Sequence, residues 1–302
     1  MRLGVGVPVS GSWATPANIR RIATLSEELG YDSLWTFQRL LHPVDEEWGS
    51  AYHGVLDPIA ALAYVAALTS RIRVGLAVVN MPYYAPLVLS KALTTLDVVS
   101  EGRLEVGLGL GWAPPEFEAV GVSRVGRGAR AEEYIRYLTT TWTEPEPEFH
   151  GAYYDLPRSL VEPKPVQKPY PPVLMGGAAE AALRRVGRIA DGWISSSRTD
   201  LTTIGQSIEV VRAAAAEAGR DPSRLRFVVR GVVRLTDDDL TDRRPLHGSA
   251  AQITADLEAL ADTGVTEVFF DLNWDSETTS ADVDPLDALH NAERLLRAFA
   301  PQ

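Results

Sequence analysis

The stretch RLEVGLGLGW, residues 103–112, decides the fold. It predicts a strand over residues 104–108 that runs into glycines at positions 107, 109 and 111. A short apolar run bounded by glycines is typical of a strand that is covered on both faces. Glycine at every second position clears side chains from one face of the strand end, so another backbone or a flat ligand can come close. Tight packing at a strand corner explains the glycines equally well, and no acidic residue follows at the spacing of a dinucleotide fingerprint.

Strand-like and helix-like segments alternate outward from this stretch along the whole chain. The predicted strands cover residues 3–9, 33–37, 72–79, 104–108, 172–176, 192–195, 225–233 and 265–271. The main predicted helices cover residues 17–29, 58–68, 86–99, 127–142, 177–186, 201–218, 249–261 and 285–299, with a short one over 114–120. Eight strands that alternate with eight helices predict an α/β fold of the (β/α)8 TIM barrel type. The competing doubly wound open sheet usually has fewer strands, and its switch-point fingerprint does not occur.

One segment breaks the alternation. Residues 143–171 contain seven prolines, and apolar and polar residues alternate over residues 149–156. This alternation favours an ordered insertion with short extended pieces over a flexible linker. The sequence therefore predicts one barrel domain over residues 1–302 with an insertion at about 143–171.

Composition excludes several classes of function. The chain has 302 residues, of which 45% are hydrophobic and 23% charged, as in an ordinary globular enzyme. A net charge of −11 argues against nucleic acid as a partner, and the absence of cysteine excludes disulfides and thiolate metal sites. No signal peptide opens the chain and no apolar run approaches the length of a membrane span. We expect a soluble cytoplasmic protein.

The active site of a TIM barrel lies at the carboxyl ends of its strands. The residues expected there are Pro8, Phe37 to Arg39, Ala77 to Asn80, Gly109 to Trp112, Gly176 and Gly177, Ser195 to Ser197, Arg230, and Asp271 to Trp274. This set contains no H-x-H metal pair, no pair of acids and no G-x-S-x-G elbow, so no metal site is predicted. It is rich in glycine and in apolar and aromatic residues, which favours a flat conjugated cofactor that performs the chemistry.

Gly176, Gly177 and Ala178 are a candidate cofactor-binding turn between a strand and a helix. Free N–H groups at the start of a helix attract anions, and glycine lets a phosphate approach closely. A plain tight turn is the alternative.

Three charged or titratable residues follow the second predicted strand. Arg39 would bind a substrate carboxylate or a cofactor tail, or would form a structural salt bridge. His42 and His53 are candidate proton donors, although loop histidines are more often solvated. Arg127 and Arg130 begin a predicted helix, where ion pairs are favoured over a phosphate contact.

Several motifs, in the same order along the chain, resemble the luciferase-like monooxygenase superfamily. They include ELGYDSLW (28–35), DPIAALAYVAALTSRIRVGLAVV (57–79), TLDVVSEGRLEVGLGLGW (95–112), RGARAEEY (127–134), FHGAYYDL (149–156), EPKPVQKPYPPVLMGG (162–177) and DGW (191–193). More closely, they resemble its actinobacterial oxidoreductases that depend on the deazaflavin coenzyme F420. It covers about residues 1–200 well and the remainder loosely.

The resemblance implies a barrel with insertions, a homodimer, and a cofactor at the carboxyl face. It also implies a cis peptide bond at Ala77–Val78 behind the deazaflavin ring and a phosphate site at Gly176 and Gly177. The contacts to the ring and the ribityl chain would come from Gln38, Ala77, Val78, Asn80, Gly109, Gly111 and Trp112.

The chain departs from the family after the second strand. The family often has an acidic residue followed by a histidine there, whereas this chain has Gln38 and Arg39. The proton donor is then another group, such as His42 or His53, or the substrate itself; Arg39 would instead steady an anionic intermediate. Three functions are considered. The first is hydride transfer between F420 and a small organic substrate, the second is a monooxygenase that uses FMN supplied by a partner reductase, and the third is a cofactor-binding protein without catalysis.

Overall fold

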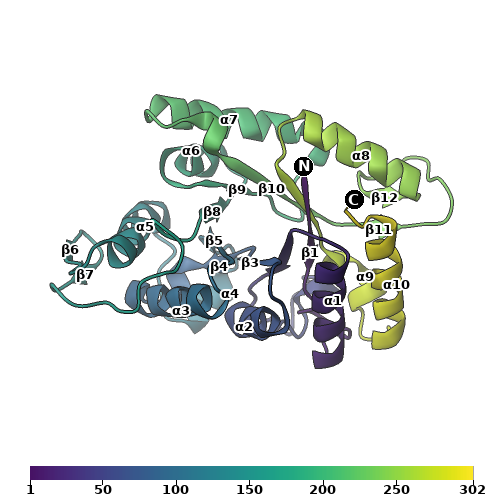
Figure 1. Ribbon diagram of the computed structural model, residues 1–302, viewed down its shortest axis with the longest axis horizontal. Helices are drawn as coiled ribbons and strands as arrows, with labels where there is room; N and C mark the ends of the chain where they lie inside the picture. Colours follow the sequence, from purple (N-terminus) through teal and green to yellow (C-terminus); the bar gives the residue numbers. More distant parts are fainter. Residues whose placement is uncertain (302) are drawn as a thin grey trace.

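A parallel sheet closed into a barrel forms the centre of the computed structural model, which describes residues 1–301 (Figure 1). The strand order is β3-β2-β1-β13-β10-β9-β8-β5-β4, and a pairing of β3 with β5 closes the barrel. β3 and β4 are two pieces of one predicted strand, so the nine segments correspond to the eight strands of a barrel. This confirms the predicted TIM barrel. The strands are β1 Arg2–Gly6, β2 Ser33–Thr36, β3 Arg73–Leu76, β4 Val79–Asn80, β5 Leu104–Gly109, β8 Val173–Gly176, β9 Gly192–Ile194, β10 Arg226–Gly231 and β13 Glu267–Phe270.

Helices surround the strands (Figure 1). They are α1 Pro16–Glu28, α2 Pro58–Leu68, α3 Pro86–Val99, α4 Pro114–Ala119, α5 Arg127–Thr143, α6 Glu180–Ile189, α7 Ile204–Glu217, α8 Ala250–Asp262, α9 Ser276–Thr279 and α10 Pro285–Ala298. The side chains of Thr15, Asp57 and Ser249 accept hydrogen bonds from backbone N–H groups in the first turns of α1, α2 and α8. Over residues 1–301, no helix combines the length and the apolar character that crossing a membrane requires.

Two segments differ from the prediction. α6 begins at Glu180, three residues later than predicted, because Ala179 is still extended and serves as its N-cap. A 3₁₀ turn over Leu272–Trp274 and the short helix α9 follow β13, where no helix was predicted. Residues 236–246 of the predicted loop lie between two short paired strands, β11 Arg234–Leu235 and β12 His247–Gly248, and its last residue, His247, begins β12.

The insertion contains an antiparallel pair of short strands, β6 Phe149–His150 and β7 Asp155–Leu156, which lies beyond α5 at the left of Figure 1. Their turn is fixed by Glu133 of α5, whose buried carboxylate accepts hydrogen bonds from the N–H groups of Ala152, Tyr153 and Tyr154 at 2.7–2.9 Å. The predicted extended pieces are therefore present and ordered by a helix of the barrel.

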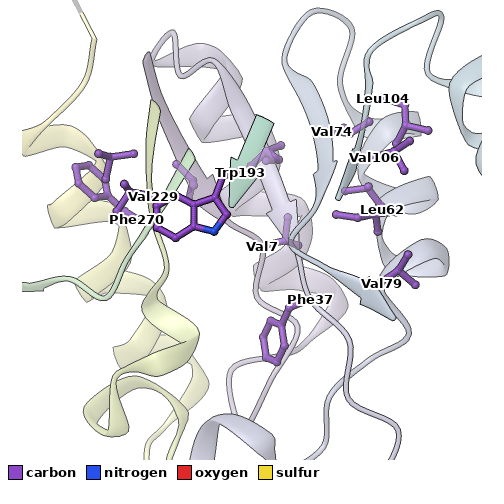
Figure 2. Close-up of a cluster of buried hydrophobic side chains, with 14 of the residues drawn as sticks. Val7, Phe37, Leu62, Val74, Val79, Leu104, Val106, Trp193, Val229 and Phe270 are labelled. Carbon is purple, nitrogen blue, oxygen red and sulfur yellow. The ribbon is translucent and has the colours of Figure 1, made fainter. Parts of the chain in front are cut away.

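The core has an outer and an inner layer, because neighbouring strand residues face opposite sides of the barrel wall. Outward side chains such as Val74, Leu104 and Val106 pack with Leu62 of α2 (Figure 2). Inward side chains form a second cluster, in which the rings of Trp35 and Phe269 stack with their centroids 5.4 Å apart. The barrel interior is filled, so a ligand site is confined to its mouth.

Candidate active site

A cavity of about 590 Å³ opens at the carboxyl ends of the strands. Its walls come from the segments after β2, β9 and β10, from the β11–β12 segment and from the turn after β13. This size lies within the range of small-molecule sites. The lining includes Trp48, Tyr52, Arg198, Arg230, His247 and Trp274. The cavity thus occupies the place where the barrel fold predicts chemistry.

Arg39 is buried beside the cavity and is paired with a carboxylate from α4. Its Nη1 lies 2.8 Å from Oε2 of Glu116, a side chain with no exposed surface. The guanidinium carbon lies 5.3, 4.7 and 4.8 Å from the ring centroids of Trp48, Tyr52 and Trp112. These rings hold the cation by cation–π attraction. Arg39 therefore forms the structural salt bridge that was one of its predicted roles.

Glu116 is itself held by further donors. The backbone N–H of Leu40 donates to its Oε1 at 2.7 Å, and the hydroxyl of Tyr83 donates to its Oε2 at 2.9 Å. Burial raises the pKa of Tyr83, and the neighbouring Glu116 carboxylate raises it further, so the phenol keeps its proton and remains a donor. Glu116 therefore joins α4 to the segment after β2.

Gln38 links two other segments of the barrel mouth. Its Nε2 donates to the hydroxyl oxygen of Tyr84 at 2.6 Å, and its Oε1 accepts from the backbone N–H of Asn80 at 2.8 Å. Oδ1 of Asn80 in turn accepts from the N–H of Gly111 at 2.9 Å. Gln38 and Asn80 thus fix the β4 end and the glycine segment relative to each other.

The glycines of residues 107–111 face the interrupted strand β3–β4. A Cβ on Gly107 would lie 1.8 Å from the carbonyl oxygen of Leu76, and one on Gly109 would lie 2.5 Å from Cγ2 of Val78. Gly111 has φ +69°, a backbone conformation that favours glycine. Close packing against a neighbouring strand, one of the two predicted explanations, is therefore present at Gly107 and Gly109.

The peptide bond Ala77–Val78 between β3 and β4 is cis, as the resemblance implied. The half-buried side chain of Val78 lies between two glycines, because a Cβ on Gly176 would also contact its Cγ1, at 3.4 Å. The two glycines place no side chain of their own against this apolar surface. The geometry suits contact with a flat ring.

Arg230 and Asp271 connect the cavity to the Ala77–Val78 bulge, the cis peptide segment that interrupts the strand between β3 and β4. The guanidinium of Arg230 donates to the carbonyl oxygen of Ala77, and its Nε lies 3.3 Å from Oδ2 of Asp271. Burial lowers the pKa of Arg230 and raises that of Asp271, while each charge opposes the shift of the other. The sequence places both residues at strand ends, but only the fold reveals that they support Ala77.

Gly176 is the last residue of β8, Gly177 follows it, and Ala178 is exposed. The predicted phosphate site assumed that these residues start the helix, whereas α6 begins at Glu180. The carbonyl oxygen of Gly177 accepts a hydrogen bond from Nε1 of Trp193 at 2.8 Å. Gly177 to Ala179 therefore connect β8 to the first turn of α6 at the barrel mouth.

The two candidate histidines lie together beside Trp48. Their Nε2 atoms are 3.1 Å apart, and the backbone N–H of Trp48 donates to Nε2 of His42 at 3.3 Å. His53 is exposed and His42 half-buried, and neither lines the cavity. The histidine of the lining is His247, which sequence reasoning missed because it lies in a segment that was interpreted only as a charged loop.

Arg127 and Arg130 lie elsewhere, at the start of α5. They line a water-sized pocket of about 10 Å³ together with Met81 and Tyr134. The guanidinium of Arg130 donates to the backbone carbonyl of Ser123. This pocket is too small for a cofactor.

Comparison with known sequences gives a consistent family. The model of the luciferase-like monooxygenases matches residues 2–239. The uncharacterized protein Rv0953c of Mycobacterium tuberculosis is 31% identical over 282 residues, which are 89% of this chain and 91% of that protein. The FMNH(2)-dependent dimethylsulfone monooxygenase of Pseudomonas putida is 29% identical over 211 residues, covering 69% of this chain and 56% of that enzyme.

Solved structures share the fold over nearly the whole chain. The monooxygenase RslO1 from Streptomyces bottropensis superposes with a TM-score of 0.83 at 21% identity, covering 99% of this chain and 98% of that one. An F420-dependent secondary alcohol dehydrogenase in complex with an F420-acetone adduct gives 0.78 at 17% identity, covering 99% of both chains.

Proposed function

Because the chain belongs to the luciferase-like monooxygenase family, we propose that it is an oxidoreductase that transfers a hydride between coenzyme F420 and a small organic substrate. The observation that carries the proposal is the apolar surface of Val78 at the Ala77–Val78 bulge, flanked by Gly109 and Gly176. This apolar surface would hold one face of a deazaflavin ring, and such a cofactor supplies the hydride chemistry itself. A solved relative in fold is named as F420-dependent.

The residues of the chain would serve to hold and orient the cofactor. Val78 would support the ring, and Arg230 would fix the bulge through its hydrogen bond to Ala77. Gln38 and Asn80 would keep Gly111 and Trp112 in place beside it. Arg39 would act from behind the aromatic rings of the cavity wall, because its guanidinium is already paired with Glu116.

Three histidines are candidates for the proton donor. His42 and His53 remain candidates at the rim, and His247 is a further candidate because it lines the cavity. Burial lowers the pKa of His247, and the charges of Arg234 and Arg244 lower it further, so the ring is neutral at neutral pH. A neutral imidazole can give or take one proton within the cavity.

The second candidate is a monooxygenase that uses reduced FMN. The similarity to an FMNH(2)-dependent enzyme favours it, because that relative is closer in sequence than the F420-dependent structure. Both functions use the same barrel mouth and differ in the cofactor.

Titration of the purified protein with F420 and with FMN, followed by fluorescence, separates the two. We expect F420 to bind with micromolar or tighter affinity and FMN at least about tenfold more weakly. Preference for FMN would replace hydride transfer by the monooxygenase. Binding of neither would contradict both proposals.

A glycine variant tests where the cofactor binds. Gly176→Ala adds a methyl group whose nearest neighbour is at 3.4 Å, an ordinary contact, so the free protein should keep its stability. If the cofactor approaches this backbone, the variant should lose about tenfold or more of its F420 affinity. Unchanged affinity would place the cofactor away from Gly176.

A further inference from the structure

Two arginines of the cavity wall carry charge that no carboxylate of residues 1–301 neutralises. Arg198, after β9, and Arg244, before β12, both line the cavity and are exposed, and neither forms a salt bridge. Arg230 differs from them, because Asp271 lies 3.3 Å from its Nε. The wall therefore presents two available guanidinium groups to whatever enters.

The lining contains one acidic residue, Asp200, whose carboxylate accepts hydrogen bonds within its own loop. Oδ1 of Asp200 accepts hydrogen bonds from the N–H and the hydroxyl of Thr202, at 2.9 and 2.7 Å, and thereby caps the 3₁₀ turn Leu201–Thr203. His247 adds no positive charge at neutral pH. Asp200 keeps its negative charge, but the two arginines without carboxylate partners outnumber it, so the unpaired charge of the lining is net positive although the chain as a whole is acidic.

Three aromatic side chains, Trp48, Tyr52 and Trp274, line the same cavity. The rings of Tyr52 and Trp274 meet edge to face with their centroids 4.9 Å apart, and Trp48 lies 6.0 Å from Tyr52. The guanidinium of Arg198 lies 5.5 Å from the centroid of Trp112, so it is held next to this group of rings. Flat apolar surface and cationic groups therefore occur in one cavity.

We infer that the cavity selects an aromatic carboxylate as the substrate of the proposed hydride transfer. The carboxylate group binds between Arg198 and Arg244, whose planar guanidinium groups match its geometry, and the ring lies against Trp48 and Trp274. That this ligand is a substrate rests on the proposed function, whereas its binding as an anion depends only on the residues of the cavity. The anionic tail of the cofactor offers the same chemistry, so the experiment must distinguish the two.

The test compares two probes of equal size and shape, naphthoate and naphthamide, by quenching of tryptophan fluorescence in the full-length protein. We expect naphthoate to bind at least about tenfold more tightly than naphthamide, because naphthoate carries a charged carboxylate and naphthamide a neutral amide. In Arg198→Gln/Arg244→Gln, naphthoate affinity should fall about tenfold or more and naphthamide affinity should stay within about twofold. Arg136→Gln/Arg224→Gln, which removes two exposed arginines without salt bridges outside the cavity, should change neither.

Equal affinities for the two probes, or naphthoate binding that survives the cavity double variant, would overturn the inference. An F420 titration of the same variant provides the second arm. We expect unchanged F420 affinity; a tenfold loss of F420 affinity with unchanged naphthoate binding would assign the arginines to the cofactor tail. Failure of the wild-type protein to bind F420 or FMN would reject the proposed function, while the naphthoate comparison would still decide the nature of the cavity.

Discussion

At the scale of single residues, the pair Arg39 and Glu116 is the most constrained feature beside the cavity. Removing one partner of a buried ion pair leaves the other charge without compensation, at a cost of about 3 kcal/mol or more. We expect Glu116→Gln to lower the free energy of unfolding by this amount in urea denaturation. The double variant Arg39→Met/Glu116→Gln should be more stable than Glu116→Gln, because it removes both charges. Additive losses in this cycle would show that the two side chains do not depend on each other.

A second residue-scale prediction concerns Gly109. A methyl group at this position would lie 2.5 Å from Cγ2 of Val78 and 2.7 Å from Oδ1 of Asn80. Gly109→Ala should therefore destabilise the protein by about 2 kcal/mol and weaken cofactor binding, because Val78 and Asn80 must move. Gly205→Ala in α7 is the matched control, since its nearest neighbour would be at 3.8 Å. It should stabilise the protein by about 0.5 kcal/mol. A fully stable Gly109→Ala protein would contradict the packing described for β5.

At the scale of secondary structure elements, the sequence predicts what local interactions determine. Thr15, Asp57 and Ser249 each cap a helix through backbone groups a few residues away, and these helix starts are correct. The predicted start of α6 was wrong, because Ala179 is extended and because the carbonyl oxygen of Gly177 accepts a hydrogen bond from Trp193, a contact that no local pattern reveals.

The same limit applies to the site. The positions of Gln38, Arg39, Arg230 and Asp271 at strand ends follow from the alternation of strands and helices. Their partners do not, since Glu116 and Ala77 reach them only through the closure of the barrel. The roles of the site residues in binding and catalysis therefore stay predictions. The structure gives the side chains and backbone groups that each of these residues contacts.

Helices α2 and α3 form an element-scale surface on which the expected homodimer can be tested. On α3, Leu87, Val88, Val98 and Val99 are exposed, and the exposed positions of α2 are alanines. Leu87 and Val88 lie at the start of α3 and Val98 and Val99 at its end, with the exposed Lys91 and Thr95 between them. Exposed apolar side chains favour association. We expect the wild-type protein to elute as a dimer in size-exclusion chromatography and Val88→Lys/Val99→Lys to elute as a monomer.

The control for this experiment is Val125→Lys. Val125 is 84% exposed and precedes α5, so it belongs to neither α2 nor α3 and its substitution should leave the dimer intact. A wild-type monomer, or a dimer that persists in Val88→Lys/Val99→Lys, would contradict the assignment of this surface.

At the scale of the whole molecule, the barrel separates its site from a charged cluster at the opposite end. Glu105 of β5 and Glu267 of β13 are fully buried near the amino ends of their strands. Arg226 lies 2.5 Å from Glu105 and 3.0 Å from Glu267, Arg2 lies 2.8 Å from Glu267, and Arg73 pairs with Glu105. Strands from different sides of the barrel thus share one network. Side chains at this end of a TIM barrel usually serve stability and those at the mouth serve function.

Glu105→Gln tests this division of the molecule. Burial alone would raise the pKa of Glu105, but the charges of Arg226, Arg73 and Arg2 outweigh it and hold the pKa below its ordinary value. A lowered pKa stabilises the fold above the unfolded value of about 4.3, and this contribution is lost as the pH falls through the folded pKa. We therefore expect the variant to lose about 3 kcal/mol at pH 7 and progressively less below about pH 4, as the wild-type carboxylate also takes up its proton. The exposed Glu217→Gln, which breaks a surface pair with Arg184, should cost less than about 1 kcal/mol at any pH. Because the cluster and the mouth lie at opposite ends of the strands, F420 affinity of the folded Glu105→Gln protein should equal that of the wild type, and a weakened affinity would show that the base of the barrel also shapes the site.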